Sequence, residues 1–392
     1  MKGCVGDLKY DLLIKGGLLV DPSQGIEGYR DIAVSGSKVS AVEVEIDPKL
    51  AEKLIDASGK IVSPGLIDLH AHVYRYVKNS GIDPDLHCLE KGVTTVVDGG
   101  SSGALNFMGF KKYIIELCRT RVLGFLNVSD VGLTMGGGIG ELEDLRHFDF
   151  DRTVKVATEN RDVIVGIKIR VPKDVVGQYG PQCLRLAKEV SRTAGVPLMV
   201  HPGSLPSNLP LTDVLKVLEK GDIMTHCYPP SYPPLLPHPS VFDEEGKLLP
   251  EVYEARRRGV LFDVAHGMNN FSWETAEKAL NQNFISTTIS TDLTLDSLHS
   301  VVYDLPTVIS KFLHLGQSLS TVIEHSTIVP ATVLGMEDRI GTLKVGAEAD
   351  IAIFKIEEGE FPLWDNIRPI KKQRTINKLL KPVKVIKGGK VV

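Results

Sequence analysis

The chain has 392 residues, of which 43% are hydrophobic and 24% are charged. These values are typical of a globular protein, so they exclude a chain that is mainly disordered. Lys and Arg number 45 against 49 Asp and Glu, and the resulting net charge of -4 indicates neither a nucleic-acid partner nor an anionic membrane surface. The length suits one large barrel with an accessory domain, or two medium domains.

The sequence also argues against a membrane-spanning or secreted protein. No apolar run approaches the roughly 20 residues that a transmembrane helix needs. Residues 1–10 carry charge and glycine and lack the apolar centre of a signal peptide. The five cysteines are scattered, with no CxxC pair, which fits a reducing compartment better than a disulfide framework. We therefore expect a cytoplasmic protein.

Both ends of the chain have the pattern of short strands around glycine turns. The stretches concerned are 10–20, 31–42, 346–354 and 383–392. Because the two ends share one pattern, we predict that residues 1–62 and 343–392 form a single small β-sandwich domain. The remaining residues, 63–342, would then be inserted within it.

In the inserted region, short apolar runs alternate with amphipathic stretches. The predicted strands are 66–70, 93–98, 122–128, 163–171, 197–201, 223–226, 260–266 and 285–291. The predicted helices are 107–117, 181–194, 211–219, 251–258, 273–281 and 300–313. Alternation of this kind favours a parallel sheet in an α/β protein, and eight units predict a closed (β/α)8 TIM barrel.

The histidines carry most of the functional information. His70 and His72 form an HxH pair at the end of the first barrel strand, where residues i and i+2 point to the same side and could face one metal ion. His201, His226 and Asp292 each end another strand, at the face where such barrels place catalytic groups. A structural role could explain one of these residues, but hardly all of them together.

Lys168 lies within the strongly apolar run 163–170. A bare ammonium group is costly to bury. Three interpretations follow from the residues alone: the side chain reaches solvent, pairs with a carboxylate, or is chemically modified.

At this point the sequence resembles the amidohydrolase superfamily of metal-dependent hydrolases. The segments that carry the resemblance are 11–17, 64–72, 92–98 and 341–350. Within the superfamily it is most similar to the dihydroorotase-like amidohydrolase/deacetylase branch, through segments 98–103, 106–107, 165–170, 225–227 and 262–267.

The resemblance implies a centre of two divalent metal ions. It implies that His70, His72 and Asp292 hold one ion, that His201 and His226 hold the other, and that Lys168 bridges both as a carboxylated lysine. Zn²⁺ suits imidazole and carboxylate ligands best, although the ligand chemistry does not exclude Mn²⁺ or Fe²⁺. The attacking group would be a hydroxide bridging the metals, with Asp292 moving its proton to the leaving group.

Two further residues are candidate substrate contacts. Arg170 follows Lys168 by two residues, and it could clamp a substrate carboxylate or form a structural ion pair. His266 ends the seventh predicted strand and could contact the substrate or pack at the rim. Asp98, near another strand end, fits an N-cap or a support for a ligand better than direct catalysis.

The functional expectation is a metallohydrolase that cleaves an amide or ester bond of a small acylated acid, as a deacetylase does. The alternative is a cyclic amide hydrolase of the dihydroorotase or hydantoinase kind. A non-catalytic scaffold of the same fold is a third hypothesis, which the full set of ligand residues disfavours. The expected partner is a small-molecule substrate, not nucleic acid or a membrane, and a homo-oligomer would be compatible with such a barrel.

Overall fold

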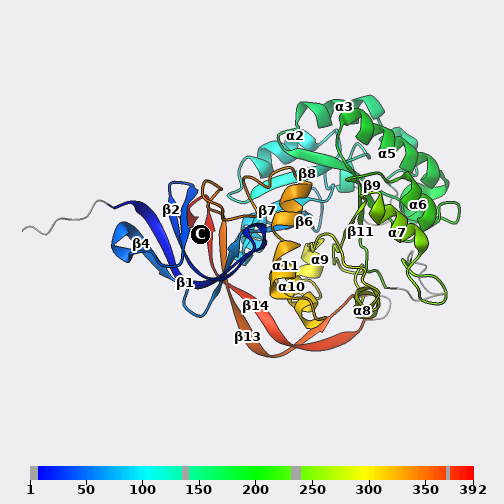
Figure 1. Cartoon of the computed structure of the whole chain (residues 1–392). Helices are drawn as coiled ribbons and strands as arrows, with labels where there is room; N and C mark the ends of the chain where they lie inside the picture. The colour runs from blue at the N-terminus through cyan, green and yellow to red at the C-terminus, as the bar shows by residue number, and fades with distance from the viewer. Residues whose placement is uncertain (1–7, 135–140, 231–239, 368–370) are drawn as a thin grey trace, which may run out of the picture.

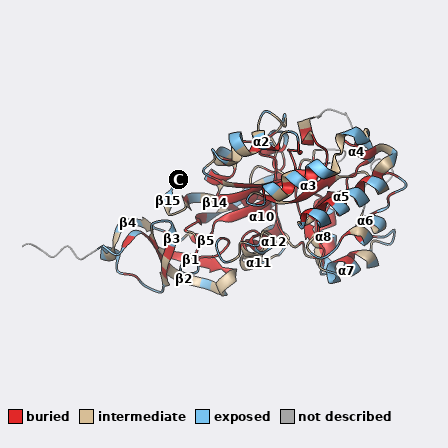
Figure 2. Cartoon of the chain, turned by 90° about the horizontal axis from the view of Figure 1, so that it is seen from above, coloured by how far each residue is buried: buried red, intermediate tan, exposed pale blue. Residues whose placement is uncertain are grey.

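The computed structural model describes residues 8–134, 141–230, 240–367 and 371–392. Figure 1 shows a body of strands wrapped by helices, with a β-sheet beside it that contains both ends of the chain. The strands of the barrel are buried, whereas the outward faces of the surrounding helices are exposed (Figure 2). No helix of the described residues is long and apolar enough to cross a bilayer.

The sheet beside the barrel is mixed and combines the two ends of the chain. Its strand order is β15-β14-β13-β5-β1-β2-β3, and β4 pairs with β1. The bounds are β1 Tyr10–Asp21, β2 Ile26–Ser35, β3 Lys38–Glu43, β4 Ala51–Asp56, β5 Ile61–Pro64, β13 Ile351–Trp364, β14 Gln373–Lys387 and β15 Lys390–Val391. Ile351 of β13 pairs with Pro64 of β5, which joins the two ends. The predicted union of the termini is therefore confirmed.

The barrel is built from parallel strands hydrogen-bonded in chain order from β6 to β12. They are β6 Leu66–Ala71, β7 Val93–Asp98, β8 Arg121–Asn127, β9 Ile164–Arg170, β10 Leu198–His201, β11 Ile223–Thr225 and β12 Leu261–Asp263. Every residue of β6 and β7 is buried, as expected for parallel strands covered on both faces. Because the strands run the same way, their carboxyl ends meet at one rim.

The barrel closes without a regular eighth strand, so the strand predicted at 285–291 is wrong in that form. Among the described residues, Thr288 of this segment makes an isolated bridge with Asp263, and Leu293, just after the segment, makes one with Ala71. It thus joins β12 to β6 and completes the ring.

The turn that follows α11 explains why no ladder forms between this segment and β6. The Ile289 N–H donates to the His325 carbonyl, and the Ile67 N–H donates to the Ser326 carbonyl. These two donors therefore serve the turn and not a partner strand. An apolar run in the sequence cannot reveal such a competing partner.

Helices cover the outside of the barrel. They are α1 Pro84–His87, α2 Phe107–Phe110, α3 Phe150–Glu159, α4 Lys173–Val176, α5 Gly180–Ala194, α6 Leu211–Val217, α7 Pro250–Arg257, α8 Trp273–Asn281, α9 Leu295–Leu298, α10 Leu305–His314, α11 Leu319–Glu324 and α12 Ile328–Val333. The predicted helix 107–117 continues from α2 as a π-helical turn, Lys111–Ile115. The predicted helix 300–313 begins later, because Asp304 caps α10 by accepting from the Thr307 N–H.

The long strands β13 and β14 reach out of the sheet and pass along the barrel under α10 towards α8 (Figure 1). The Leu380 N–H of β14 donates to Ser310 Oγ of α10 at 2.8 Å. The carboxyl-terminal part of the chain is therefore packed against α10.

Candidate metal centre

The strand ends bring six side chains to one rim of the barrel. His70 lies on β6 and His72 just after it, Lys168 lies on β9, His201 ends β10, His226 follows β11, and Asp292 lies in the closing segment. The imidazole rings form one continuous run, with centroid distances of 5.6 Å for His72–His70, 5.4 Å for His70–His226 and 4.4 Å for His226–His201. Residues up to 222 positions apart in the chain are therefore neighbours here.

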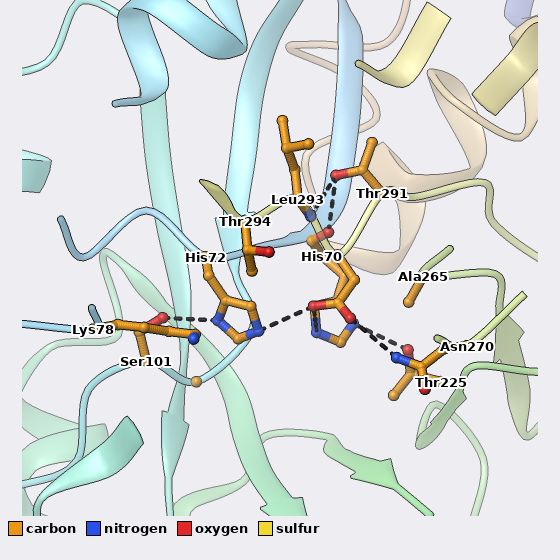
Figure 3. A network of polar contacts seen from close by, with 12 residues as sticks. His70, His72, Lys78, Ser101, Thr225, Ala265, Asn270, Thr291, Leu293 and Thr294 are labelled. Carbon is orange, nitrogen blue, oxygen red and sulfur yellow. Dashed lines mark hydrogen bonds and ion pairs between the residues drawn. The ribbon is translucent and has the colours of Figure 1, made fainter. Parts of the chain in front are cut away.

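His70, His72 and Asp292 form the tightest group, with one potential ligand atom from each within 4.8 Å of the others. Figure 3 shows the two histidines side by side. His72 Nε2 lies 3.1 Å from Asp292 Oδ1, and His70 Nε2 lies 3.7 Å from the same oxygen. Both histidines are buried, while 13% of the Asp292 side chain is exposed. The carboxylate is thus the most exposed member of the group.

A hydrogen-bond relay fixes the tautomer of His70. Asp263 accepts hydrogen bonds from the hydroxyls of Thr225, Thr288 and Ser290. Because Thr225 donates its only hydroxyl hydrogen to Asp263, its oxygen must accept from His70 Nδ1, which lies 3.0 Å away. His70 Nε2 therefore carries a lone pair and faces Asp292 Oδ1, another electron-rich atom, so a cation between them would be stabilising.

His226 is oriented in the same way by a backbone carbonyl. Its Nδ1 lies 2.8 Å from the Ala265 oxygen, which can only accept, so Nδ1 carries the hydrogen. Its Nε2 is buried and has no hydrogen-bond partner among the described residues. A buried polar atom without a partner is costly unless an unseen group satisfies it. A metal ion would satisfy this one.

The electrostatics keep these imidazoles neutral. Burial holds the pKa values of His70, His72 and His201 well below the ordinary value for histidine. Burial also lowers the pKa of His226 to about 3. Neutral imidazole is the form that binds a metal. The residues at this rim therefore fit a metal centre.

Lys168 is buried beside the histidines. Its Nζ lies 3.2 Å from His70 Nε2 and 3.3 Å from Met199 Sδ. Burial lowers its pKa to about 7, so much of this amine is neutral near physiological pH. Of the three interpretations of this lysine, exposure to solvent is wrong, because only 1% of the residue is accessible.

The backbone around the cluster is unusually constrained. His226 and Asp292 have positive φ values of 62° and 49°, a region that side-chain-bearing residues rarely adopt. A Cβ atom on Gly99 would lie 2.3 Å from His70 Cδ2, so only glycine lets this backbone approach the imidazole. Such strain is common at functional sites.

Two cationic side chains lie near the histidines. Arg170 pairs with the buried carboxylate of Glu141, while its Nε and Nη2 have no partner among the described residues. Lys78 extends towards His72 on the side of Ser101 (Figure 3), and its Nζ donates to Ser80 Oγ at 2.7 Å. Of the two, sequence reasoning missed Lys78, because it lies in a loop without periodicity.

The His266 ring is engaged in contacts within the protein. Its Nδ1 lies 2.9 Å from the Gly267 carbonyl, and its Nε2 lies 2.7 Å from Lys311 Nζ. The ring also stacks on Phe271 at a centroid distance of 4.5 Å. With both nitrogens engaged and no exposure, this geometry favours the packed-histidine interpretation.

Asp98 supports the centre from β7. It accepts from the N–H groups of Val73 and Ser101, at 2.8 and 2.6 Å. Ser101 Oγ in turn lies 2.8 Å from His72 Nδ1. This arrangement fits Asp98 as a support for the candidate ligand His72 better than as a catalytic group.

Known proteins resemble this chain over nearly its whole length. A deacetylase from Enterococcus faecalis is 33% identical over 390 residues, which covers 98% of this chain and 99% of the relative. A deacetylase from Agrobacterium fabrum is 33% identical over 365 residues, covering 92% of this chain and 86% of the relative.

Two crystal structures show the same fold. One is described as an adenine deaminase, with a TM-score of 0.87 and 33% identity, covering 98% of this chain and 99% of that one. The other is described as a dihydroorotase, with a TM-score of 0.87 and 31% identity, covering 98% of each chain. The model of the amidohydrolase family matches residues 61–392. With this match and the metal-site geometry together, the chain belongs to the amidohydrolase family and is a hydrolase of that family.

Proposed function

We propose that the protein is a metal-dependent deacetylase-like enzyme that hydrolyses the amide or ester bond of a small acylated acid. The observation that carries this proposal is the run of neutral imidazoles beside Asp292, in which Nε2 of His70 carries a lone pair towards Asp292 and Nε2 of His226 is buried without a hydrogen-bond partner among the described residues. The deacetylase relatives support the choice of acyl bond.

In this proposal His70, His72 and Asp292 hold one divalent ion, and His201 and His226 hold a second. Zn²⁺ fits these ligands best. When bound, such ions lower the pKa of water and polarise a carbonyl group. The ligands supply only neutral nitrogens and one carboxylate, so a further anion would improve the balance of charge.

Lys168 would supply that anion as a carbamate. Its neutral amine attacks CO2, forming an N–C bond and releasing one proton, and the product carries one negative charge. The pKa of about 7 and the position beside His70 Nε2 favour this reaction at physiological pH. The modification would also remove an ammonium group from a buried site.

Asp292 would act as the proton carrier. It takes a proton from the attacking water and delivers it to the leaving nitrogen or oxygen as the acyl C–N or C–O bond breaks. Its partial exposure supports this role, and the amide of Asn270 lies 3.3 Å from its Oδ2. That amide would hold the carboxylate in one rotamer.

Arg170 and Lys78 would recognise the acid group of the substrate. The guanidinium is anchored through Nη1 on Glu141, and its other nitrogens remain for a carboxylate. Lys78 adds a second positive charge on the side of His72. Two cations near a neutral cluster favour an anionic substrate over a neutral one.

The test is a substrate panel with the zinc-loaded protein. It contains N-acetyl amino acids, O-acetyl hydroxy acids, their carboxamide analogues, dihydroorotate and adenine. Hydrolysis of acetylated acids, with their carboxamides hydrolysed more slowly, supports the proposal. Turnover of dihydroorotate alone would replace it with the cyclic amide hydrolase, which the dihydroorotase structure favours. Turnover of none of these compounds, with the protein metal-loaded, would refute the proposed substrate class.

Carboxylation of Lys168 has its own test. Protein loaded with zinc in ¹³C-bicarbonate should show a carbamate carbon signal, and Lys168→Met should lack it and bind less metal. A metal-loaded wild-type protein without that signal would refute the bridge. We also propose a cytoplasmic location and a small-molecule substrate as the partner, without binding of nucleic acid or membrane; a homo-oligomer would be compatible with this fold.

A further inference from the structure

A second buried lysine lies outside the metal centre and has no part in the proposed chemistry. Lys311 of α10 is fully buried, and its Nζ has three acceptors: His266 Nε2 at 2.7 Å, the Val301 carbonyl at 2.8 Å and the Trp364 carbonyl at 2.7 Å. Burial lowers the pKa of Lys311 to about 7, but the three acceptors match the three N–H donors of the ammonium form and favour that form. The group also lies 5.6 Å from the ring centre of Phe271.

The partner histidine is held in one tautomer. His266 Nδ1 faces the Gly267 carbonyl, which can only accept, so Nδ1 carries the hydrogen and Nε2 accepts from Lys311. Burial, reinforced by the charge of Lys311, holds the pKa of His266 well below its ordinary value. Lys311 therefore fixes both the ring and the carbonyl behind it.

His266 lies in the loop of residues 264–272, which joins β12 to α8 and touches two candidate metal ligands. The Ala265 carbonyl accepts from His226 Nδ1 at 2.8 Å, and Asn270 Nδ2 donates to Asp292 Oδ2 at 3.3 Å. The loop backbone itself approaches the carboxylate, since a Cβ on Gly267 would lie 2.5 Å from Asp292 Oδ2. The position of this loop thus sets the orientation of His226 and Asp292.

The segment at the end of β13, which reaches towards α8 in Figure 1, holds the same loop. The Trp364 carbonyl accepts from Lys311, and the Ile367 N–H donates to the Met268 carbonyl at 3.0 Å. Asp365 Oδ2 accepts from the Trp273 N–H, at the start of α8, at 3.4 Å. Residues 364–367, which belong to the carboxyl-terminal part of the chain, therefore clamp a loop of the barrel.

We propose that Lys311 is a positioning residue that acts through His266, tying the 264–272 loop to the end of β13 and so setting the geometry of His226 and Asp292. The inference rests on the proposed function for its kinetic readout, but not for its other readouts. It assigns the carboxyl-terminal strand a task in catalysis besides closing the β-sheet.

The test compares Lys311→Met with Lys188→Met. Methionine keeps the length and apolar stem of lysine but removes its donors. Lys188 of α5 is also buried and paired, with Asp222 Oδ2 at 2.6 Å and Glu219 Oε2 at 3.0 Å. Asp222 precedes β11, whereas His226 follows it, so the control lies at the opposite end of the barrel.

For Lys311→Met we expect kcat to fall by about 100-fold with KM little changed, because a displacement of about 1 Å can cost that much in rate. We also expect zinc affinity, measured by chelator competition, to weaken by ~10-fold or more, and the amides of 264–272 to exchange hydrogen faster. Lys188→Met should lose stability without these changes. Equal effects in both variants, or unchanged zinc affinity and exchange in a folded Lys311→Met, would overturn the proposal.

A wild-type measurement keeps the proposal testable if Lys311→Met does not fold. In ¹⁵N-histidine-labelled protein, His266 should have a protonated Nδ1 and an unprotonated, hydrogen-bonded Nε2. A protonated Nε2 would refute the hydrogen bond that His266 accepts from Lys311. Zinc affinity, exchange and this spectrum need no substrate, so failure of the proposed function would leave them interpretable.

Discussion

The relay from Asp263 through Thr225 to His70 makes a sharp prediction about metal binding. Thr225→Val keeps the shape of the side chain but removes its hydroxyl. His70 Nδ1–H then loses its hydrogen-bond acceptor, because Asp263 Oδ2 lies 3.7 Å away, beyond hydrogen-bonding distance; the cost is ~1–3 kcal/mol. Supports of this kind are worth about 10- to 100-fold in metal affinity, which corresponds to roughly 1.4–2.8 kcal/mol. We expect the zinc dissociation constant to rise by that factor.

Thr288→Val is the matched control. Thr288 Oγ1 also donates to Asp263, at 2.7 Å, but it makes no contact with His70. Both variants remove one hydroxyl from the same carboxylate, so the difference between them isolates the link to the imidazole. Zinc affinity is measured by chelator competition and stability by urea unfolding of the metal-free protein. If both variants bind zinc equally well, the relay does not orient His70 and our reasoning is refuted.

Three further predictions concern chemistry, specificity and pH. Asp292→Asn should lower kcat by at least ~100-fold while keeping much of the metal, and wild-type turnover would exclude Asp292 as the proton carrier. Arg170→Met should raise KM for acylated acids but not for their carboxamides; an equal rise for both would favour a purely structural ion pair with Glu141. Burial lowers the pKa of His325 to about 4, so the unfolded chain binds a proton that the folded chain excludes between pH 6.5 and 4. Stability is therefore lost as the pH falls through this window, by about 2 kcal/mol at pH 5, and urea unfolding of His325→Asn should show a shallower loss than wild type.

Much of the fold could be predicted because buried parallel strands have a simple signature. The strand β7 begins and ends where the apolar run 93–98 does. The segment 285–291 also combines β-branched residues, yet its partners are a turn and scattered bridges, which depend on contacts far along the chain. The local sequence pattern therefore predicted that a segment belongs to the barrel wall, but it did not predict which groups the segment's backbone would bond.

The candidate ligands could be proposed from the sequence because strand ends meet at one rim, whatever the detailed packing. The groups that orient these ligands could not be proposed from the sequence. Thr225 serves His70 only because β11 pairs with β12 in the register that sets Thr225 opposite Asp263. Lys78 lies in a loop, and its proximity to His72 follows from a path that no periodicity encodes. The assignment of the ligands to two metal ions stays a prediction.

The strained backbone at the rim shows how the fold and the site depend on each other. Ala265, like His226 and Asp292, has a positive φ, and all three residues follow the end of a strand or bridge at the rim. Each such residue costs about 1–3 kcal/mol, so the surrounding structure must fix it. The Ala265 N–H donates to Ser290 Oγ at 3.0 Å, and Ser290 also donates to Asp263, the carboxylate behind His70. The Ser290 hydroxyl, which stabilises the strained loop, is thus hydrogen-bonded to the Asp263 carboxylate, which orients His70. A substitution of Ser290 or Asp263 would therefore affect both halves of the proposed metal centre.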